Sequence, residues 1–385
     1  MPQPSAKVIS EAGALVEERP QISPFFSVCI PHYSRYPFLR EQLETLARQT
    51  YRNFEVCISD DFSAEQQRSV SIIEFLKASK LPFAYRLQTE NLRYDANLRA
   101  AIDLARGEFA VLMGNDDKFA DETILELLHH RILEHAPVSA VITNYKEIPS
   151  GRVFRRVLRD GVVGTGADVA TRTYRNYAFV SGVVLRRAEA IHHRTTDWDG
   201  SEMYQMFLGS RTVAAGGRLL GLTDVAVLKD IQIPGLEVDS YRNRRIEYSK
   251  YLRERALPVC QIPALVWNAV APFAQEKRRG RIAWQVLRQM LLFTHPYWMV
   301  ELRRIHGLRY AFEVCLGMRP RNLTKRMTLP FWARWAARGL FVASSAIGLS
   351  FPVSVFEKCS PLLHALAKRN GRPPAARSGI KHVRA

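Results

Sequence analysis

The stretch Gly107-Glu108-Phe109-Ala110-Val111-Leu112-Met113-Gly114-Asn115-Asp116-Asp117 decides the fold of this chain. It reads as a turn, an apolar run with strand character, and then two adjacent carboxylates. Open α/β sheets bind their ligands at the edge beyond the carboxyl ends of the strands. Two carboxylates at that edge are typical of a divalent cation that is shared with substrate phosphates. The other interpretation is a solvated acidic turn that caps a helix starting near Asp121.

Strand-like runs and helical periods alternate on both sides of this stretch. Apolar runs predict strands at 25–30, 54–59, 83–88 and 108–113, and helical periods lie between them at 38–49, 65–79 and 91–106. This alternation predicts an α/β fold with a mostly parallel, Rossmann-like sheet flanked by helices. Beyond Pro137 the pattern weakens, and we expect strands at 138–143, 177–185 and 219–228, a hairpin at 153–163 and a helix at 201–214.

The charge is distributed unevenly along the 385 residues. Residues 241–385 carry a balance of +21, whereas the first 240 residues carry −3. We therefore expect a loose tail at 1–24, an α/β domain at 25–240 and a basic, mainly helical region at 241–385, with a helix at 241–250. The basic surplus indicates an anionic partner for the C-terminal region.

Several classes of site are poorly supported. The chain has no Gly-x-Gly-x-x-Gly after its first strand, no Walker-type Gly-Lys-Ser/Thr and no Gly-x-Ser-x-Gly. Its five cysteines include no Cys-x-x-Cys pair, which disfavours a zinc site or a disulfide framework and suits a reducing compartment. The first 24 residues lack the apolar stretch of a signal peptide.

Polar sets follow three of the predicted strands. They are Pro31-His32-Tyr33-Ser34, Asp60-Asp61-Phe62-Ser63 and Asn115-Asp116-Asp117. In a parallel sheet these ends lie side by side. Tyr33 offers an aromatic face to a base, Asp61 can accept hydrogen bonds from a base or a ribose, and the last two acids can take a ribose and a cation. Together the three ends suit a nucleoside diphosphate.

These segments resemble the opening of the family 2 glycosyltransferases. The matching runs are SVCIPHYS at 27–34, LARQTYRNFEV at 46–56, SDDFS at 59–63, ENLRYDAN at 90–97 and ARGEF at 105–109. The resemblance covers about residues 25–121 closely and 138–228 loosely. The run LMGNDD at 112–117 is most similar to the branch that adds deoxysugars to bacterial surface polysaccharides, such as O-antigens.

The resemblance implies a GT-A fold, a nucleotide-sugar donor, a divalent metal (Mn or Mg) and inversion at the anomeric carbon. Within it, Pro31 and Tyr33 line the base pocket and Asp61 binds the base. The residues assigned by position to the nucleotide-sugar site are Pro31, Tyr33, Asp61, Asn91, Asn97 and Asp116. The metal is assigned to Asp117 and Asp116, with either acid as the principal ligand.

The sequence departs from the family pattern at three places. Gly114 or Asn115 stands where many members have the first Asp of an Asp-x-Asp, which removes one charge from the site. Phe62 replaces the usual Gly, and Ser34 replaces the usual Asn.

An inverting transfer needs a base that takes the proton of the acceptor hydroxyl. Asp197, Asp199 and Glu202 form the acidic cluster on the acceptor side, and family members carry a Glu-Asp pair at the start of a helix there. Glu202 is the first candidate and Asp199 the second. The alternative is helix capping by Asp199 or Ser201, with Glu202 in the first turn.

The C-terminal region interleaves arginine with tryptophan, which suits an anionic bilayer surface. An ordinary helical subdomain with a solvated basic face is the other interpretation. Nucleic acid is disfavoured because no recognised motif is present. Residues 339–356 carry no charge, but their serines, glycines and proline predict an interfacial or buried segment instead of a span.

The sequence thus predicts an inverting, metal-dependent glycosyltransferase at the cytoplasmic face of the cell membrane, with a lipid-linked or cell-envelope glycan as acceptor. The alternative is a non-catalytic fold that binds nucleotide sugars and whose basic tail binds a membrane or another partner.

Overall fold

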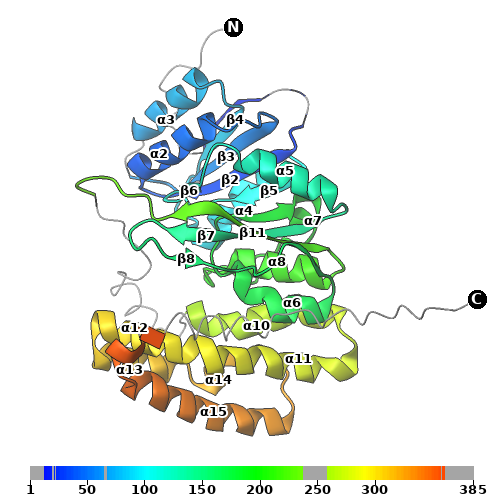
Figure 1. Cartoon of the computed structure of the whole chain (residues 1–385), viewed down its shortest axis with the longest axis vertical. Helices are drawn as coiled ribbons and strands as arrows, with labels where there is room; N and C mark the ends of the chain where they lie inside the picture. Colours follow the sequence, from blue (N-terminus) through cyan, green and yellow to red (C-terminus); the bar gives the residue numbers. More distant parts are fainter. Residues whose placement is uncertain are drawn as a thin grey trace, which may run out of the picture.

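The computed structural model describes residues 13–19, 21, 23–64, 67–236, 258–356 and 358–359. The described chain forms an α/β sheet domain that rests on a layer of helices (Figure 1). Its strands are β1 (Leu15–Glu18), β2 (Phe26–His32), β3 (Phe54–Asp60), β4 (Phe83–Leu87), β5 (Phe109–Leu112), β6 (Lys118–Phe119), β7 (Ala140–Glu147), β8 (Val153–Phe154), β9 (Gly161–Gly164), β10 (Val183–Arg186) and β11 (Leu219–Lys229).

The helices of the α/β part lie between these strands. They are α2 (Tyr36–Ala47), α3 (Gln67–Ala78), α4 (Arg93–Asp103), α5 (Ile124–Glu134), α6 (Ala167–Thr173), η1 (Tyr174–Tyr177), α7 (Arg187–His192) and α8 (Tyr204–Ala214). The C-terminal helices are α10 (Pro258–Val270), η2 (Ala271–Phe273), α11 (Glu276–Gln289), η3 (Met290–Thr294), α12 (His295–His306), α13 (Leu308–Gly317), α14 (Pro320–Leu323) and α15 (Phe331–Ser350).

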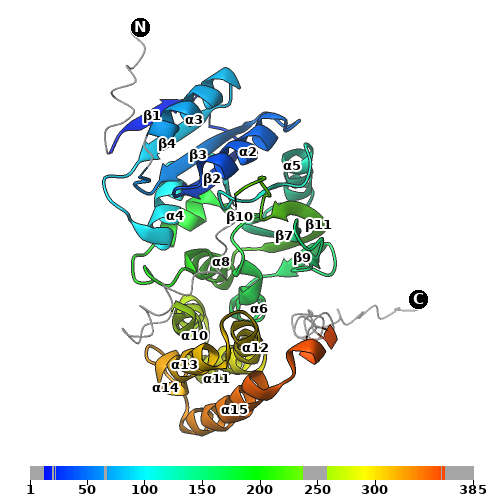
Figure 2. The ribbon, with the colours of Figure 1, turned by 90° about the vertical axis from the view of Figure 1, so that its left-hand side faces the viewer.

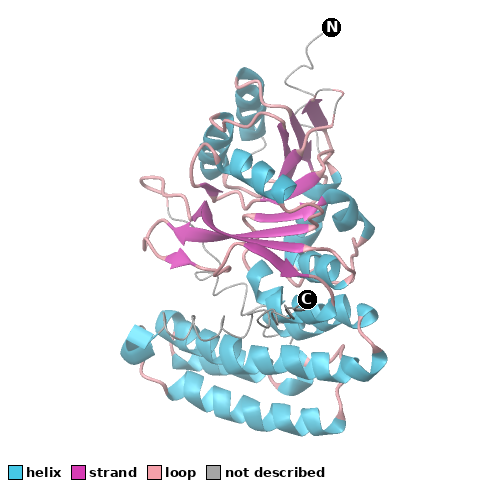
Figure 3. Ribbon diagram, turned by 45° about the vertical axis from the view of Figure 1, so that its right-hand side comes forward, coloured by secondary structure: helices cyan, strands magenta, loops and turns pink. Residues whose placement is uncertain are grey.

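The sheet has the strand order β1-β4-β3-β2-β5-β10-β7-β11-β6. Its centre, β4-β3-β2-β5, is parallel, as the alternation of strands and helices predicted. Every residue of β2 and β3 is buried, because helices cover both faces of the sheet (Figure 3). Strand β10 runs antiparallel between β5 and β7, and it joins the first half of the sheet to the second.

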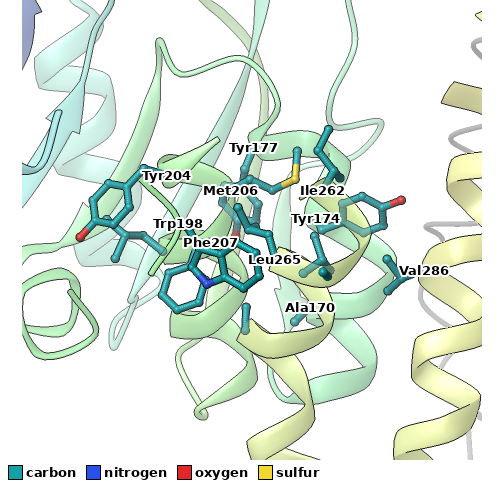
Figure 4. Packing of buried hydrophobic residues seen from close by; sticks show 14 of the residues in the cluster. Ala170, Tyr174, Tyr177, Trp198, Tyr204, Met206, Phe207, Ile262, Leu265 and Val286 are labelled. Atoms are coloured by element: carbon teal, nitrogen blue, oxygen red, sulfur yellow. The ribbon is translucent and has the colours of Figure 1, made fainter. Parts of the chain in front are cut away.

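Two apolar cores lie on the two faces. Helices α2, α3 and α5 pack on one face, with Leu43 and Ile73 among the buried residues. On the other face α4 and α8 pack against the sheet, and the same cluster of buried residues continues into the C-terminal helices. Figure 4 shows this junction, where Leu265 and Ile262 of α10 meet Phe207 of α8. The two layers therefore share one core.

Three local predictions are wrong. Residues 15–18, expected in a loose tail, form β1 at the sheet edge and pair with β4. The predicted hairpin at 153–163 does not form, because β8 pairs with β7 and β9 pairs with β11. The strand expected at 177–185 starts only at Val183, because Gly182 turns the chain with φ +77°.

The C-terminal helices form the end of the molecule opposite the N-terminus (Figure 2). The helix predicted at 241–250 lies outside the described residues. Within the described ranges, no helix combines the length and the apolar character that crossing a bilayer requires.

Candidate active site

Three strand ends meet at one edge of the sheet. His32, the last residue of β2, pairs in register with Asp60, the last residue of β3. The backbone N–H of Asp61 donates to the carbonyl oxygen of His32 over 2.9 Å. The segment after β5 joins them through Asn115, whose Nδ2 lies 2.9 Å from Nδ1 of His32. The structure therefore brings together the three polar sets that the sequence placed side by side.

His32 holds this edge together as a neutral ring. Burial lowers its pKa to about 4, so the imidazole carries no charge at neutral pH. Nδ1 of the neutral ring accepts a hydrogen bond from the Asn115 amide. The backbone carbonyl oxygen of His32 accepts a second hydrogen bond, from Nδ2 of Asn97 over 3.2 Å. Asn97, assigned to the donor site from the sequence, is itself buried beneath the edge and orients the end of β2.

Asp60 organises the turn after β3, a role that the sequence analysis missed. Its carboxylate is fully buried and accepts hydrogen bonds from the hydroxyls of Tyr36 and Tyr85 and from the backbone N–H of Ser63. The turn places Phe62 at φ +59°, which is the left-handed conformation that favours glycine. This backbone geometry explains why relatives with the same turn would carry glycine at this position.

Asp61 points from the turn toward the start of α4. One of its oxygens accepts the backbone N–H of Leu92. Burial raises the pKa of Asp61 to about 6, although the N–H groups of Leu92 and Arg93 act in the opposite direction. Asn91 is exposed, and its side-chain oxygen accepts the N–H of Arg93 over 3.0 Å. The predicted base-binding acid and the segment around Asn91 are thus neighbours.

Pro31 and Tyr33 differ in accessibility. Pro31 is buried within β2, opposite Ser59 of β3. The Tyr33 side chain is 50% exposed, so its ring is open to a stacking partner.

The two acids after β5 have different environments. Asp117 is 2% exposed, and its carboxylate accepts hydrogen bonds from Ser181 Oγ and from the backbone N–H of Asp230. Burial, and then the neighbouring charge of Asp116, raise the pKa of Asp117 well above its usual range. Asp116 is more exposed and forms an ion pair with Arg35, from the loop after β2.

Gly114 fits tightly against both acids. A Cβ at this position would lie 3.1 Å from Oδ2 of Asp117 and 3.2 Å from Oδ1 of Asp116. The backbone of Gly114 is held on both sides, because its N–H donates to Ser181 Oγ and its carbonyl oxygen accepts Nε2 of Gln42. The absence of a side chain at Gly114 therefore leaves room for the Asp116 and Asp117 carboxylates beside the turn.

A divalent cation fits these residues only in company with a substrate. Asp116 and Asp117 supply hard oxygen ligands, and each carboxylate keeps lone pairs beyond the hydrogen bonds that it accepts. The described residues contain no group of three or more metal-ligating side chains. Such a pair suits a cation that takes its remaining ligands from phosphate oxygens and water, not one enclosed by protein.

The loop before α8 carries Glu202 and is anchored by a buried acid. Asp95 of α4 is 2% exposed and accepts the backbone N–H groups of Glu202, over 2.8 Å, and of Tyr204, over 3.0 Å. Burial raises the pKa of Asp95 to about 6. Glu202 adopts φ +57° in this loop, and Asp95 therefore fixes the backbone of the first candidate base in a conformation that it would rarely adopt alone.

Asp199, the second candidate base, is engaged elsewhere. Both of its oxygens accept from the Arg99 guanidinium at 2.7 Å, and Arg99 also donates to the carbonyl oxygen of Thr195. A bidentate pair of this kind holds the loop to α4. The Asp199 carboxylate is therefore committed to Arg99.

Tyr94 lies where the donor side and the acceptor side meet. Its hydroxyl donates to Oε1 of Gln205 over 3.1 Å. Burial raises its pKa well above the usual range, and carboxylates from three segments add to the shift, namely Asp95, Glu202, Asp117 and Asp116. The four acids are thus close enough to the Tyr94 phenol to disfavour its ionisation.

Comparison with known proteins agrees with this geometry. Residues 27–194 match the family model described as Glycosyl transferase family 2. This part of the chain is therefore similar to glycosyl transferase family 2. The matched segment extends from β2 past α7, and it contains all of the strand ends described above.

Two curated relatives are sugar transferases by name. The chain is 27% identical over 173 residues to the amylovoran biosynthesis glycosyltransferase AmsB of Erwinia amylovora, covering 44% of this chain and 58% of AmsB. It is 33% identical over 100 residues to the abequosyltransferase RfbV of Salmonella typhimurium, covering 26% of this chain and 30% of RfbV. The chain therefore spans about half or less of the length of these relatives.

Solved structures show the same fold over a longer range. The structure of S. aureus TarS residues 1–349 in complex with UDP superposes with a TM-score of 0.55 at 15% identity, over 87% of this chain and 91% of that one. The chain thus has the predicted GT-A fold followed by a helical C-terminal region.

Proposed function

We propose that this chain transfers a sugar from a nucleotide-diphosphate donor to a cell-envelope glycan or a lipid-linked acceptor, with inversion at the anomeric carbon. The match to family 2 over residues 27–194 and the similarity to the glycosyltransferase AmsB and the abequosyltransferase RfbV support this class of reaction. The observation that carries the proposal is the junction of the three polar strand ends, which brings Asp61 and the Asn115-Asp116-Asp117 segment to one edge of the sheet.

The donor would lie along the three strand ends. Tyr33 offers a ring on which the base can stack, and Asp61 offers a carboxylate beside it. The diphosphate would then extend toward Asp116 and Asp117. Asp116 is held by Arg35, which places a guanidinium next to the position of the phosphates.

The transfer itself needs one displacement and one proton transfer. An oxygen of the acceptor hydroxyl forms a bond to the anomeric carbon, the bond from that carbon to the diphosphate breaks, and the Glu202 carboxylate takes the hydroxyl proton. Asp95 contributes by holding the backbone of the Glu202 loop in place before the acceptor arrives. Asp116 and Asp117 would hold a divalent cation (Mn or Mg), which when bound neutralises charge on the leaving diphosphate.

The basic C-terminal helices would hold the enzyme at the cytoplasmic face of the cell membrane. Residues 258–356 contain 14 Lys+Arg and 3 Asp+Glu, and this surplus favours an anionic surface.

The donor is identified first by thermal shift with UDP-, GDP- and dTDP-sugars in the presence of Mn²⁺. A specific donor raises the apparent stability of the folded state. The same donor is then used to measure hydrolysis and transfer.

Asp117→Asn is the deciding variant for the catalytic assignment. We expect it to reduce turnover at least about 100-fold, because it replaces a carboxylate that would bind the cation at the leaving diphosphate. Asp103→Asn is the matched control, since Asp103 forms only an exposed pair with Arg194. Full turnover in Asp117→Asn would refute the assignment.

A second function is favoured by one observation. Asn115 donates its amide to His32 at a position where many relatives carry an acid, so the site has one carboxylate fewer. A chain that binds a nucleotide sugar in the thermal-shift assay, but neither hydrolyses nor transfers it, would be a non-catalytic binding fold.

A further inference from the structure

Helix α15 reverses the usual distribution of side chains on a surface helix. Its buried residues are small, namely Ala333, Ala337, Ser344, Ser345 and Gly348. Four of its bulky side chains are exposed instead: Phe331 is 76% exposed, Val342 66%, Trp335 58% and Trp332 55%, whereas Leu340, Phe341 and Leu349 pack partly against the core. A helix that folds only against its own protein buries its bulky apolar residues. The outer face of α15 is therefore built for contact with something else.

The aromatic residues gather at the start of α15. Phe331 and Trp335 are one helical turn apart, with ring centroids separated by 6.5 Å. Trp332 meets the edge of Trp284 from α11, at 5.4 Å. Their exposed area forms one apolar patch, which we call the aromatic patch (Phe331, Trp332, Trp335), at the end of the molecule farthest from the sheet (Figures 1 and 2). A contiguous patch of this kind marks an interaction surface.

Only positive charge accompanies the aromatic patch on this helix. α15 contains Arg334 and Arg338 and no acid. The Arg338 guanidinium lies over the Trp335 ring, 4.6 Å from its centroid. Arginine beside tryptophan at a helix surface fits the boundary between lipid head groups and acyl chains, where the ring is partly buried and the cation meets phosphate.

Helix α11 adds cations to the same helical layer. Gly280 of α11 packs against Pro330, which directly precedes the patch. A cavity between α6 and α11 is lined by Arg172, Arg278, Arg281 and Asp168, of which only Asp168 is acidic. Asp168 pairs with Arg278, so the cavity retains a net positive charge that can receive an anionic head group.

We propose that α15 lies flat in the head-group region of an anionic bilayer, with the aromatic patch inserted and Arg334 and Arg338 at the phosphates. This inference deepens the proposed membrane partner and names its surface. The charge of the helix selects this occupant over a second copy of the chain, because two α15 faces would bring like charges together.

The test uses the full chain and vesicles of phosphatidylcholine, alone or with phosphatidylglycerol. We expect sedimentation with the anionic vesicles, and quenching of tryptophan fluorescence by lipids brominated near the head group. The variant F331S/W335S should weaken binding at least about tenfold, as should R334E/R338E, since each cation near an anionic surface contributes roughly fivefold. L133S, at a 55% exposed site on α5, and K146E/R159E, on the α/β part, are the matched controls.

Each outcome decides for or against the inference. Loss of binding in both α15 variants, with both controls unchanged, supports it. Undiminished binding in the α15 variants overturns it, and so does a concentration-dependent dimer in light scattering that F331S/W335S abolishes. Donor hydrolysis in detergent-free buffer is measured in parallel. If hydrolysis persists while vesicle binding is lost, the transferase proposal stands apart from the membrane surface.

Discussion

At the scale of single residues, the site depends on buried acids with different tasks. Asp60 is fully buried and shapes a turn, Asp95 anchors a loop, and Asp117 faces the expected diphosphate position. A buried carboxylate is costly unless it is hydrogen-bonded, and each of these accepts at least two hydrogen bonds. The amino-acid type alone does not distinguish the roles of these three residues, because an aspartate that supports the backbone and one that binds a ligand are the same letter in the sequence.

Asp95 gives a prediction about pH. Its pKa is about 6 in the folded chain and 3.8 in an unpaired aspartate, so the folded state holds the proton more tightly. The stability that this group contributes is complete below pH 4 and is lost as the pH rises through 6, by up to about 3 kcal/mol. Asp95→Asn cannot titrate. We therefore expect the difference in unfolding free energy between wild type and variant to be larger at pH 4.5 than at pH 7, by urea denaturation.

The same variant also loses one oxygen that accepts a backbone N–H, so it should be less stable than wild type at pH 4.5. A stability difference that stays constant from pH 4.5 to pH 7 would show that Asp95 does not titrate in this range.

At the scale of elements, the loop before α8 is held from α4 at two points. The Asp95 carboxylate accepts hydrogen bonds from backbone N–H groups of the loop. The Arg99 guanidinium donates to Asp199 and to the carbonyl oxygen of Thr195. One helix therefore positions the loop that carries Glu202. The anchor at the start of α4 follows Asn91, in the segment that resembles the donor motif.

Arg99→Ala should impair transfer more than donor binding. The variant frees one end of the loop and lets Glu202 drift from the acceptor, for which we expect a fall in kcat of roughly tenfold or more. Donor affinity in a thermal shift assay should stay within about twofold, because the strand ends remain in place. Arg194→Ala is the control, as its pair with Asp103 is exposed and long, at 3.4 Å. An equal loss in both variants would contradict this role.

The parallel strands were predictable because each is a short, mostly apolar run between helical periods. Short antiparallel pieces carry no such signal: β6 and β8 have two residues each, and their pairing is decided by neighbours far along the chain. The strand-end residues were predictable from sheet geometry. The contacts of Asp95 with Glu202 and of Asp117 with Asp230 span 107 and 113 residues, and no local pattern reports them.

At the scale of the whole molecule, the sheet and the C-terminal helices pack against a common core. Leu265 of α10 is fully buried in the same cluster as Phe207 of α8. The sharp change of charge after residue 240 therefore marks a change of surface, while the interior continues across it.

This shared core predicts one cooperative transition. Five of the six tryptophans lie beyond residue 258, so their fluorescence follows the C-terminal helices, whereas far-ultraviolet circular dichroism follows both parts. The two signals should change together in urea. Leu265→Ala should lower both midpoints, with a loss of about 2–5 kcal/mol. Separate midpoints in the wild type would show that the two layers fold independently.

The shared core also sets a distance. A transferase on a flexible tether can place its catalytic edge at many distances from the membrane, and it can therefore glycosylate acceptors of many lengths. Here α15 and the strand ends are joined through packed side chains. A chain bound to a membrane through α15 would therefore hold its catalytic edge at a fixed height and orientation above that membrane. An acceptor anchored in the same membrane would then be glycosylated only where its hydroxyl reaches the height of the catalytic edge.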